Sequence, residues 1–303
     1  MVVAALRSPA DWRAHAQGIH EAALPVLRWR RLGDAPALAW PALPAGAPPL
    51  QGLRVLDLTR ILAGPCAGQL LAVHGAEVAM VNSPNLPNIA HIADFSRGKR
   101  SMLLDLQQDA GRDALGQLVQ GAHVFLQGYR PGGLAAHGFS PAELAQRRPG
   151  IVVASLSAYS AGGPWAGKRG FDSLVQTATG MNLDEASALG SDAPKALPVQ
   201  MLDYAAGRLL AFGITVALLR QATQGGSWLV EVSLAGAGHW LRSLGRVADG
   251  AGVVAPAIEP WLEDTPSDWG RLSTVRHAVA IDGLALPPLG PAHRPGHDAP
   301  HWG

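Results

Sequence analysis

Asp203 is the residue of this sequence that is best placed to do chemistry, because it stands at the start of a long apolar stretch, 201–219, that is typical of a helix. A carboxylate there can act as an N-cap, accepting a hydrogen bond from a backbone N–H that the helix leaves unpaired. It can also act as a nucleophile whose charge the helix N-terminus stabilises. N-caps far outnumber nucleophiles, so position alone favours the cap, and both interpretations stay open.

Three groups of cations stand beside predicted strands or helices, where packing does not explain them. They are Arg97, Lys99 and Arg100 before a strand, Arg130 with Tyr129 after a strand, and Lys168 with Arg169 before a helix. Ligands of open parallel sheets bind outside the carboxyl ends of the strands. Cations there suit a phosphate-bearing ligand, which Arg can hold with two hydrogen bonds. A single group is better explained as solvated loop charge, but three groups together favour an anion site.

The elements that must position these residues begin with a strand at 52–58, a helix at 61–74 and a strand at 75–81. Strand, glycine-containing turn, helix and strand form a βαβ unit. We therefore expect an α/β fold, with a Rossmann-like parallel sheet that carries helices on both faces. The turn at 63–68 lacks the full G-x-G-x-x-G pattern, so a nicotinamide dinucleotide site is not favoured.

The alternation of strands and helices continues along the chain. Strands are predicted at 2–7, 101–104, 123–127, 151–155 and 228–233, and helices from Ser8 to Gln17, at 109–120, from Ser140, and at 170–180, 202–221 and 234–247, with a further regular stretch at 272–280. Prolines crowd 36–49 and 287–300, which indicates an extended linker and an extended tail. The packed domain is expected between them, at 51–247.

Composition limits the functional classes. The 303 residues contain 24 Lys and Arg against 23 Asp and Glu, so the net charge of +1 argues against nucleic-acid and membrane-surface roles. A single cysteine, Cys66, excludes an internal disulfide framework. We expect Cys66 to be a small buried residue. No apolar run of membrane-crossing length and no signal peptide are evident. We expect a soluble, cytoplasmic protein.

Six motifs resemble, in order and spacing, those of the family III CoA-transferases, the group that includes formyl-CoA transferase, carnitine CoA-transferase and α-methylacyl-CoA racemase. The motifs are GLRVLDLTRILAGP at 52–65, GAEV at 75–78, RGKRS at 97–101 with LDL at 104–106, YRPG at 129–132, GP at 163–164 and DYAAG at 203–207. The resemblance covers residues 50–245. It raises Asp203 from a cap to an expected nucleophile.

The resemblance implies that Asp203 attacks the thioester of an acyl-CoA, giving a mixed anhydride and free CoA thiolate. The acceptor carboxylate and the thiolate would then react with the anhydride in turn. The substrates would be an acyl-CoA and a carboxylic acid, with coenzyme A as part of the substrate and with no tightly bound cofactor or metal. Residues expected to bind the coenzyme are Ile61, Leu62, Ala63, Lys99, Tyr129, Arg130 and Arg169.

Several departures from the family pattern bear on function. Asn82 and Ser83 stand where an acid is common, and Ala136 replaces a further Arg that relatives carry. In the racemase branch a His precedes the acid matching Asp172, but here Phe171 stands there. Racemisation needs an acid and a base on opposite faces of the α-carbon, so the missing proton carrier disfavours a racemase.

The largest departure is architectural. Relatives carry a small domain after the helix that ends near Val247, whereas residues 2–18 here resemble the end of that domain. We therefore expect 1–35 to be a remnant of a small domain that is largely missing, 36–50 a proline-rich linker, 51–247 the large domain and 248–303 an extended C-terminal segment. Relatives form interlocked homodimers, and the extended segments at 36–49 and 248–303 are long enough to wrap a second copy. A weakly active or non-catalytic relative that binds CoA or a protein partner is the alternative function.

His293, His297 and His301 recur every four residues near the end of the chain. Pro295 and Pro300 prevent one regular helix, so the spacing does not place the three rings on one face. A metal site there is not favoured.

Overall fold

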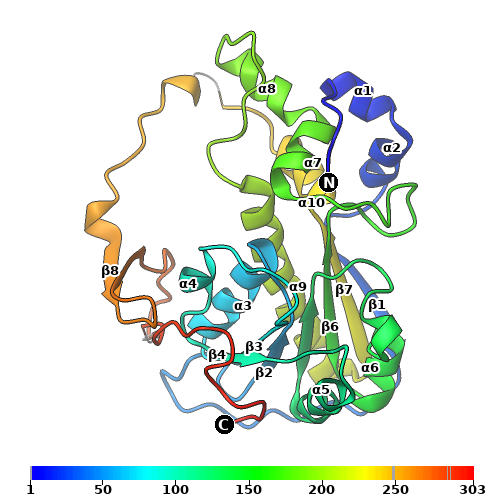
Figure 1. Cartoon of the computed structure of the whole chain (residues 1–303), viewed down its shortest axis with the longest axis vertical. Coiled ribbons are helices and arrows are strands. Elements are labelled where there is room, and N and C mark those ends of the chain that lie inside the picture. Colours follow the sequence, from blue (N-terminus) through cyan, green and yellow to red (C-terminus); the bar gives the residue numbers. More distant parts are fainter. Residues whose placement is uncertain (1, 248–249, 285, 287) are drawn as a thin grey trace.

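The computed structural model describes residues 2–247, 250–284, 286 and 288–303. At its centre is a seven-stranded sheet in the order β1-β7-β6-β5-β2-β3-β4 (Figure 1). The strands are β1 Arg28–Gly33, β2 Arg54–Asp57, β3 Glu77–Asn82, β4 Lys99–Leu103, β5 Val124–Gln127, β6 Val152–Ser157 and β7 Ser227–Ser233. All neighbours are parallel except β1, which pairs antiparallel with β7. The predicted α/β class is confirmed.

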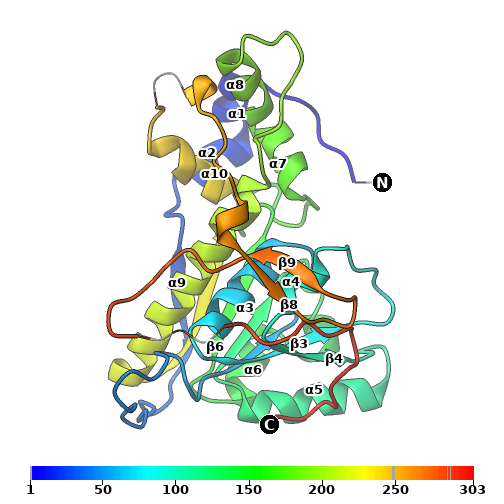
Figure 2. The same cartoon turned by 90° about the vertical axis from the view of Figure 1, so that its left-hand side faces the viewer.

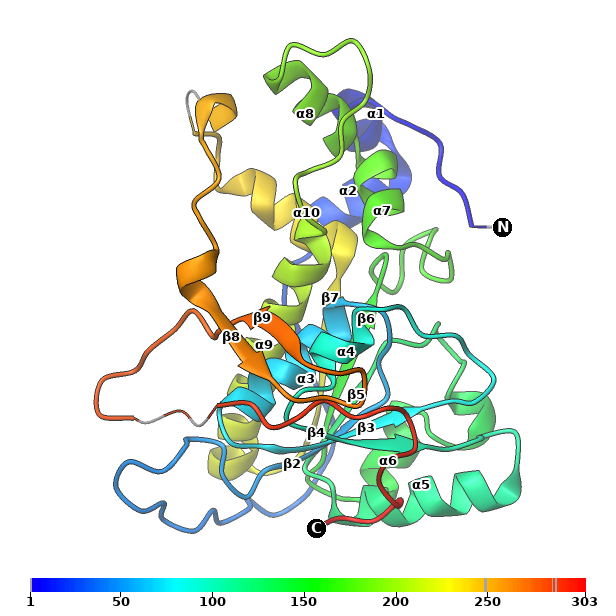
Figure 3. The same ribbon diagram turned by 60° about the vertical axis from the view of Figure 1, so that its left-hand side comes forward.

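The strands form because both of their faces are buried in apolar cores, as expected of a parallel sheet. Along β5, Val124 and Leu126 point into one core and Phe125 into the other. The first core is filled from α3 (Ala63–Val73) and α9 (Met201–Gln224). The second is filled mainly from α5 (Asp109–Gly121) and α6 (Pro141–Arg147). Helices therefore cover both faces, as Figure 3 shows.

The expectation that no apolar stretch reaches membrane-crossing length is wrong for α9, which is long and apolar enough by length and composition, with a mean hydropathy of 1.5 in its most apolar window. Of that window, 56% is buried inside the fold, between α3 and the sheet. Its apolar character thus serves the core.

Five shorter helices gather beyond the carboxyl ends of the strands, where Figures 1 and 2 show them at the top of the molecule. They are α1 Pro9–Ala14, α2 Ala16–Ala22, α7 Asp172–Thr179, α8 Met181–Ala188 and α10 Leu234–Ser243. Ser8 caps α1 in a capping box with Asp11, as its position before Pro9 predicts. The predicted strand at 2–7 is wrong, because no strand pairs there.

The N-terminal segment is joined to the sheet by buried polar contacts. The carboxylate of Glu21 accepts hydrogen bonds from the backbone N–H and hydroxyl of Ser160, both at 2.7 Å, and from the hydroxyl of Ser233 at 3.0 Å. Gln17 accepts a hydrogen bond from the backbone N–H of Trp165 at 2.8 Å. The segment thereby holds the loop that links β6 to α7.

In the C-terminal segment, the short 3-10 helices η2 (Gly250–Gly252) and η3 (Glu259–Trp261) precede a hairpin of β8 (Leu262–Thr265) and β9 (Leu272–Val275). The hairpin lies beside the short helix α4 (Ile92–Phe95) in Figure 3. The last residues then follow the outer edge of β4. The backbone N–H of Asp298 donates to the carbonyl of Ser101 at 2.9 Å, and the indole of Trp302 donates to the carbonyl of Leu118 at 2.9 Å. The predicted tail is therefore attached to the sheet.

Candidate active site

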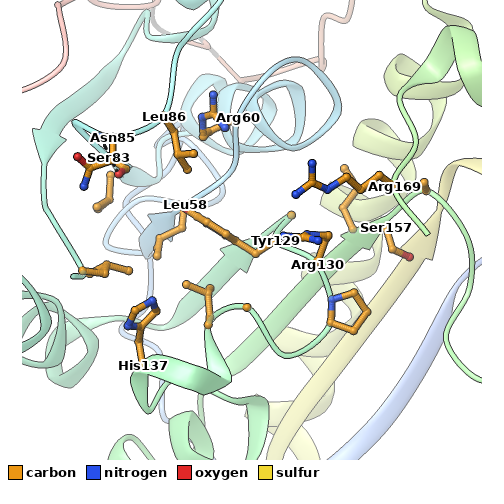
Figure 4. Close-up of a pocket in the computed structure, with 18 of the residues that line it drawn as sticks. Leu58, Arg60, Ser83, Asn85, Leu86, Tyr129, Arg130, His137, Ser157 and Arg169 are labelled. Carbon is orange, nitrogen blue, oxygen red and sulfur yellow. Dashed lines mark hydrogen bonds between the residues drawn. The ribbon is translucent and has the colours of Figure 1, made fainter. Parts of the chain in front are cut away.

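A cleft of about 670 Å³ opens where the strand order reverses between β2 and β5. The chain runs outward from β2 to β4 on one side and from β5 to β7 on the other, and ligands of open α/β sheets bind at such a point. Leu58 and Arg60 follow β2, while Tyr129 and Arg130 follow β5. All four line the cleft, and Figure 4 shows them with Arg169 around it.

The cleft continues into a smaller hollow of about 180 Å³, since Leu58, Arg60 and Tyr129 line both. The hollow is lined further in by Ile61, Leu62, Ala63 and Asp203. These residues come from the loop after β2, from the first position of α3 and from α9, which is far from the other two in the sequence. The structure thus brings the expected nucleophile together with the apolar residues expected to lie along the coenzyme.

Asp203 lies inside the first turn of α9, which begins at Met201 with Gln200 as its N-cap. The cap interpretation is therefore wrong. The Asp203 side chain is 8% exposed and opens onto the hollow. Burial, and next the nearby carboxylate of Asp172, raise the pKa of Asp203 to about 7. The group is poised to change charge near neutral pH.

Asp172, at the first position of α7, is fully buried and accepts a hydrogen bond from the backbone at the start of α9. Its Oδ2 accepts a hydrogen bond from the backbone N–H of Asp203 at 2.9 Å, and its Oδ1 accepts one from the Gln176 amide. Gln176 in turn accepts from the backbone N–H of Leu197 at 2.9 Å. Burial raises the pKa of Asp172 as well. Two buried carboxyl groups therefore share one corner of the site.

The open part of the cleft is cationic. Arg130 and Arg169, both predicted from sequence, are exposed and line it. Arg60 was missed, although a cation directly after a strand of a parallel sheet is a usable signal. Its Nε is buried without a hydrogen-bond partner among the described residues. The amide nitrogen of Asn82, also on the cleft wall, is unpartnered in the same way, so both atoms can donate to a bound ligand.

Lys99 is not brought to the cleft, and its assignment to the coenzyme needs correction. Its side chain is fully buried, and its Nζ donates to Oδ2 of Asp57 at 2.8 Å and to the carbonyl of Pro65 at 2.9 Å. An ammonium group paired in this way has no access to a ligand phosphate. The sequence could not reveal this, because the partner carboxylate stands 42 residues earlier.

Two of the C-terminal histidines meet a carboxylate. The Nδ1 atoms of His293 and His297 lie 3.3 and 3.4 Å from the two oxygens of Asp268. The imidazole rings stack with centroids 3.7 Å apart and planes 22° apart. A metal bound to both Nδ1 atoms would have to lie in both ring planes, which rings stacked this closely do not allow. The contacts instead fasten the last segment to the loop between β8 and β9.

Residues 50–245 match CoA-transferase family III. A probable fatty acyl-CoA transferase of Mycobacterium tuberculosis, Rv3272, is 34% identical over 202 residues, covering 62% of this chain and 51% of the relative. A succinate–glutarate CoA-transferase of Agrobacterium fabrum is 30% identical over 211 residues, covering 63% of this chain and 52% of the relative. The chain thus spans about half the length of these two relatives.

Solved structures agree. The crystal structure of Rv3272 matches with a TM-score of 0.58 at 30% identity, over 66% of this chain and 58% of that chain. A CAIB/BAIF family protein from Brucella suis matches with a TM-score of 0.57 at 27% identity, over 74% of this chain and 65% of that chain. Since the family match spans most of the sheet and the helices that carry the site, the chain belongs to CoA-transferase family III.

Proposed function

We propose that this chain transfers CoA between an acyl-CoA and a carboxylic acid, with Asp203 as the nucleophile. The observation that carries the proposal is a buried carboxylate at the inner end of a cleft whose open end is cationic. A phosphate-bearing coenzyme fits this polarity, because its phosphates would meet Arg130 and Arg169 while its thioester points inward.

In the proposed reaction, an ionised oxygen of Asp203 attacks the thioester carbonyl, the C–S bond breaks, and CoA leaves as a thiolate. The product is a mixed anhydride. The acceptor carboxylate then attacks the aspartyl carbonyl and displaces the donor acid. Finally the thiolate attacks the new acyl carbonyl, which forms the second acyl-CoA and restores the Asp203 carboxylate. Each attack produces an oxyanion that needs hydrogen-bond donors.

The first turn of α3 supplies suitable donors. The backbone N–H groups of Ala63 and Gly64 stand at the first two positions of that helix, where no intrahelical partner exists. Ala63 lines the same hollow as Asp203. We assign stabilisation of the oxyanion to this helix start.

The test is to incubate the full chain with an acyl-CoA, trap the anhydride with hydroxylamine, and map the label by peptide mass analysis. We expect a hydroxamate on Asp203, with loss of label and of CoA transfer in Asp203→Asn. Asp192→Asn, a change at an exposed acid, is the matched control and should retain both. Absence of the hydroxamate on Asp203, or full turnover in Asp203→Ala, would contradict the proposal.

A second candidate is a protein that binds CoA without turnover. It is supported by the Nε of Arg60 and the amide nitrogen of Asn82, which have no hydrogen-bond partner among the described residues and can hold a ligand whether or not Asp203 reacts. The two candidates differ in the same experiment: binding of free CoA without label on Asp203 supports the second. A racemase fits less well, because Phe171, which lines the cleft, has no proton to exchange.

A further inference from the structure

Ile61 adopts a backbone conformation that side chains with branched Cβ atoms avoid. Its φ angle is +73°, and it is the one non-glycine residue with positive φ in the described part of the chain. It stands between Arg60 and Leu62, in the loop that lines the hollow beside Asp203. Such a conformation persists only where the surrounding structure enforces it.

The enforcing contacts come from Asp57, the last residue of β2. Its Oδ1 accepts hydrogen bonds from the backbone N–H of Thr59, at 3.0 Å, and from the Thr59 hydroxyl. Its Oδ2 accepts from Nζ of Lys99 at 2.8 Å. Both charged side chains are fully buried. The carboxylate thus fixes the two residues that follow the strand.

Lys99 extends this network to the other end of the loop. Its Nζ also donates to the carbonyl of Pro65, in the first turn of α3, at 2.9 Å. The loop that contains Ile61 therefore runs between two points, Thr59 and Pro65, that one buried ion pair holds together. Neither charged group lines the cleft.

Glycines make room for the network and link it to α9. A Cβ on Gly68 would lie 2.3 Å from Oδ2 of Asp57, and one on Gly64 would lie 2.3 Å from the Thr59 side chain. A Cβ on Gly207, one helical turn after Asp203, would lie 2.4 Å from the carbonyl of Ala63. Helix α9 is thus seated directly on the start of α3.

A buried ion pair is weak evidence for stability, because desolvation of the two charges offsets their attraction, and replacing the pair by apolar residues is often neutral. Its value lies in geometry. We propose that Asp57, Lys99 and Thr59 are positioning residues, which hold the strained loop of Ile61 in the conformation that presents an acyl thioester to Asp203. This inference rests on the proposed CoA transfer.

The test uses a paired substitution, Asp57→Leu with Lys99→Met, in the full chain, because removing one partner alone would leave a buried charge unpaired and risk misfolding. Circular dichroism and thermal unfolding establish that the variant folds. We expect the rate of hydroxylamine trapping at Asp203 to fall about tenfold or more, since small misplacements of reacting groups have effects of this size. The half-exposed pair Arg54 and Glu77, changed to Met and Gln, is the control and should keep the wild-type rate.

A second measurement separates positioning from a structural role. If the ion pair serves to enforce the conformation of Ile61, then Ile61→Gly, which adopts positive φ without strain, should reduce the effect of the paired substitution. We therefore expect the two changes to be non-additive in trapping rate. Additive effects, or a folded pair variant with an unchanged trapping rate, would overturn the inference.

Hydrogen exchange distinguishes failure of this inference from failure of the proposed function. If the wild-type protein transfers no CoA, the proposed function fails, but the backbone amides of residues 59–63 should still exchange faster in the pair variant than in the wild type. Unchanged exchange there would overturn the positioning role whatever the activity.

Discussion

Asp203 and Asp172 are coupled through space and through the backbone. The backbone N–H of Asp203 donates to Asp172, while the two side chains compete to remain ionised in a buried setting. The reactive form of a carboxylate nucleophile is the ionised one, so the charge on Asp172 bears directly on the pH at which Asp203 can react.

We expect Asp172→Asn to move the pH profile of anhydride formation to lower pH. In the wild type the trapping rate should rise with pH to a plateau above about 7, as Asp203 ionises. Asparagine keeps an oxygen that can accept the Asp203 N–H but removes the like charge, which is one of the two causes of the raised pKa. The measurement is the pH dependence of hydroxylamine trapping, with Asp192→Asn as control. A profile with an unchanged midpoint would rule out this coupling.

Residue types in the sequence identified most of the candidate site but not the role of each residue. Tyr129 and Arg130, which the sequence places directly after a strand, line the cleft, and the stretch 61–63, which the family resemblance singled out, lines the hollow beside it. Lys99 was misassigned because charge alone does not tell whether a cation faces a ligand or a buried carboxylate.

At the scale of elements, the contact between α3 and α9 is what brings Asp203 to the loop after β2. The contact is close because Gly207 has no side chain. A residue with a Cβ at this position would push the two helices apart and move Asp203 away from Ala63.

Gly207→Ala should therefore lower both stability and activity. Overpacking of this kind costs about 1–3 kcal/mol, measured by denaturant unfolding, and the trapping rate should fall with it. The matched control is Gly116→Ala in α5, where a Cβ would meet only the end of the Arg147 side chain, at 3.4 Å. That change should raise stability by about 0.5–1 kcal/mol, because alanine favours helix. Equal effects of the two substitutions would contradict the steric explanation.

The sequence predicted well the elements that are buried on both faces, such as β5. A strand of this kind is a continuous apolar run, which can be recognised without knowing its neighbours. Strand β1 was missed because its sequence, RWRRLG, has the charge of a loop. It becomes a strand by pairing with β7, where Arg28 lies 3.7 Å from Glu231 and the Trp29 indole donates to the carbonyl of Gly213 at 3.0 Å. Edge strands depend on a distant partner, which periodicity within one segment cannot show.

At the scale of the whole molecule, the burial of Asp203 links the site to stability. The pKa of Asp203 is about 7 in the folded protein against an ordinary value of 3.8. Between these pH values the folded protein binds one more proton than the unfolded chain, so stability falls as pH rises through this window and levels off above about 7. Burial of the ionised Asp203 carboxylate at neutral pH therefore lowers the free energy of unfolding.

We expect Asp203→Asn to be more stable than the wild type at pH 8, by up to about 4 kcal/mol. The difference should shrink towards pH 4, because the wild-type carboxyl is protonated in the folded state there and is already partly protonated in the unfolded chain. Urea unfolding of the two proteins at pH 4, 6 and 8 measures it. A difference that stays constant with pH would show that the carboxylate is not destabilised by burial.

The pairing of β1 with β7 also fixes an order of events. The register pairs Arg28 with Glu231, and the strands β2 to β6 all lie between these two residues in the sequence. During synthesis, residues 28–33 leave the ribosome long before residues 227–233 exist, and they cannot enter the sheet until those residues arrive. The first strand of the chain is therefore among the last to be incorporated, and the growing protein must carry an unpaired strand for most of its translation.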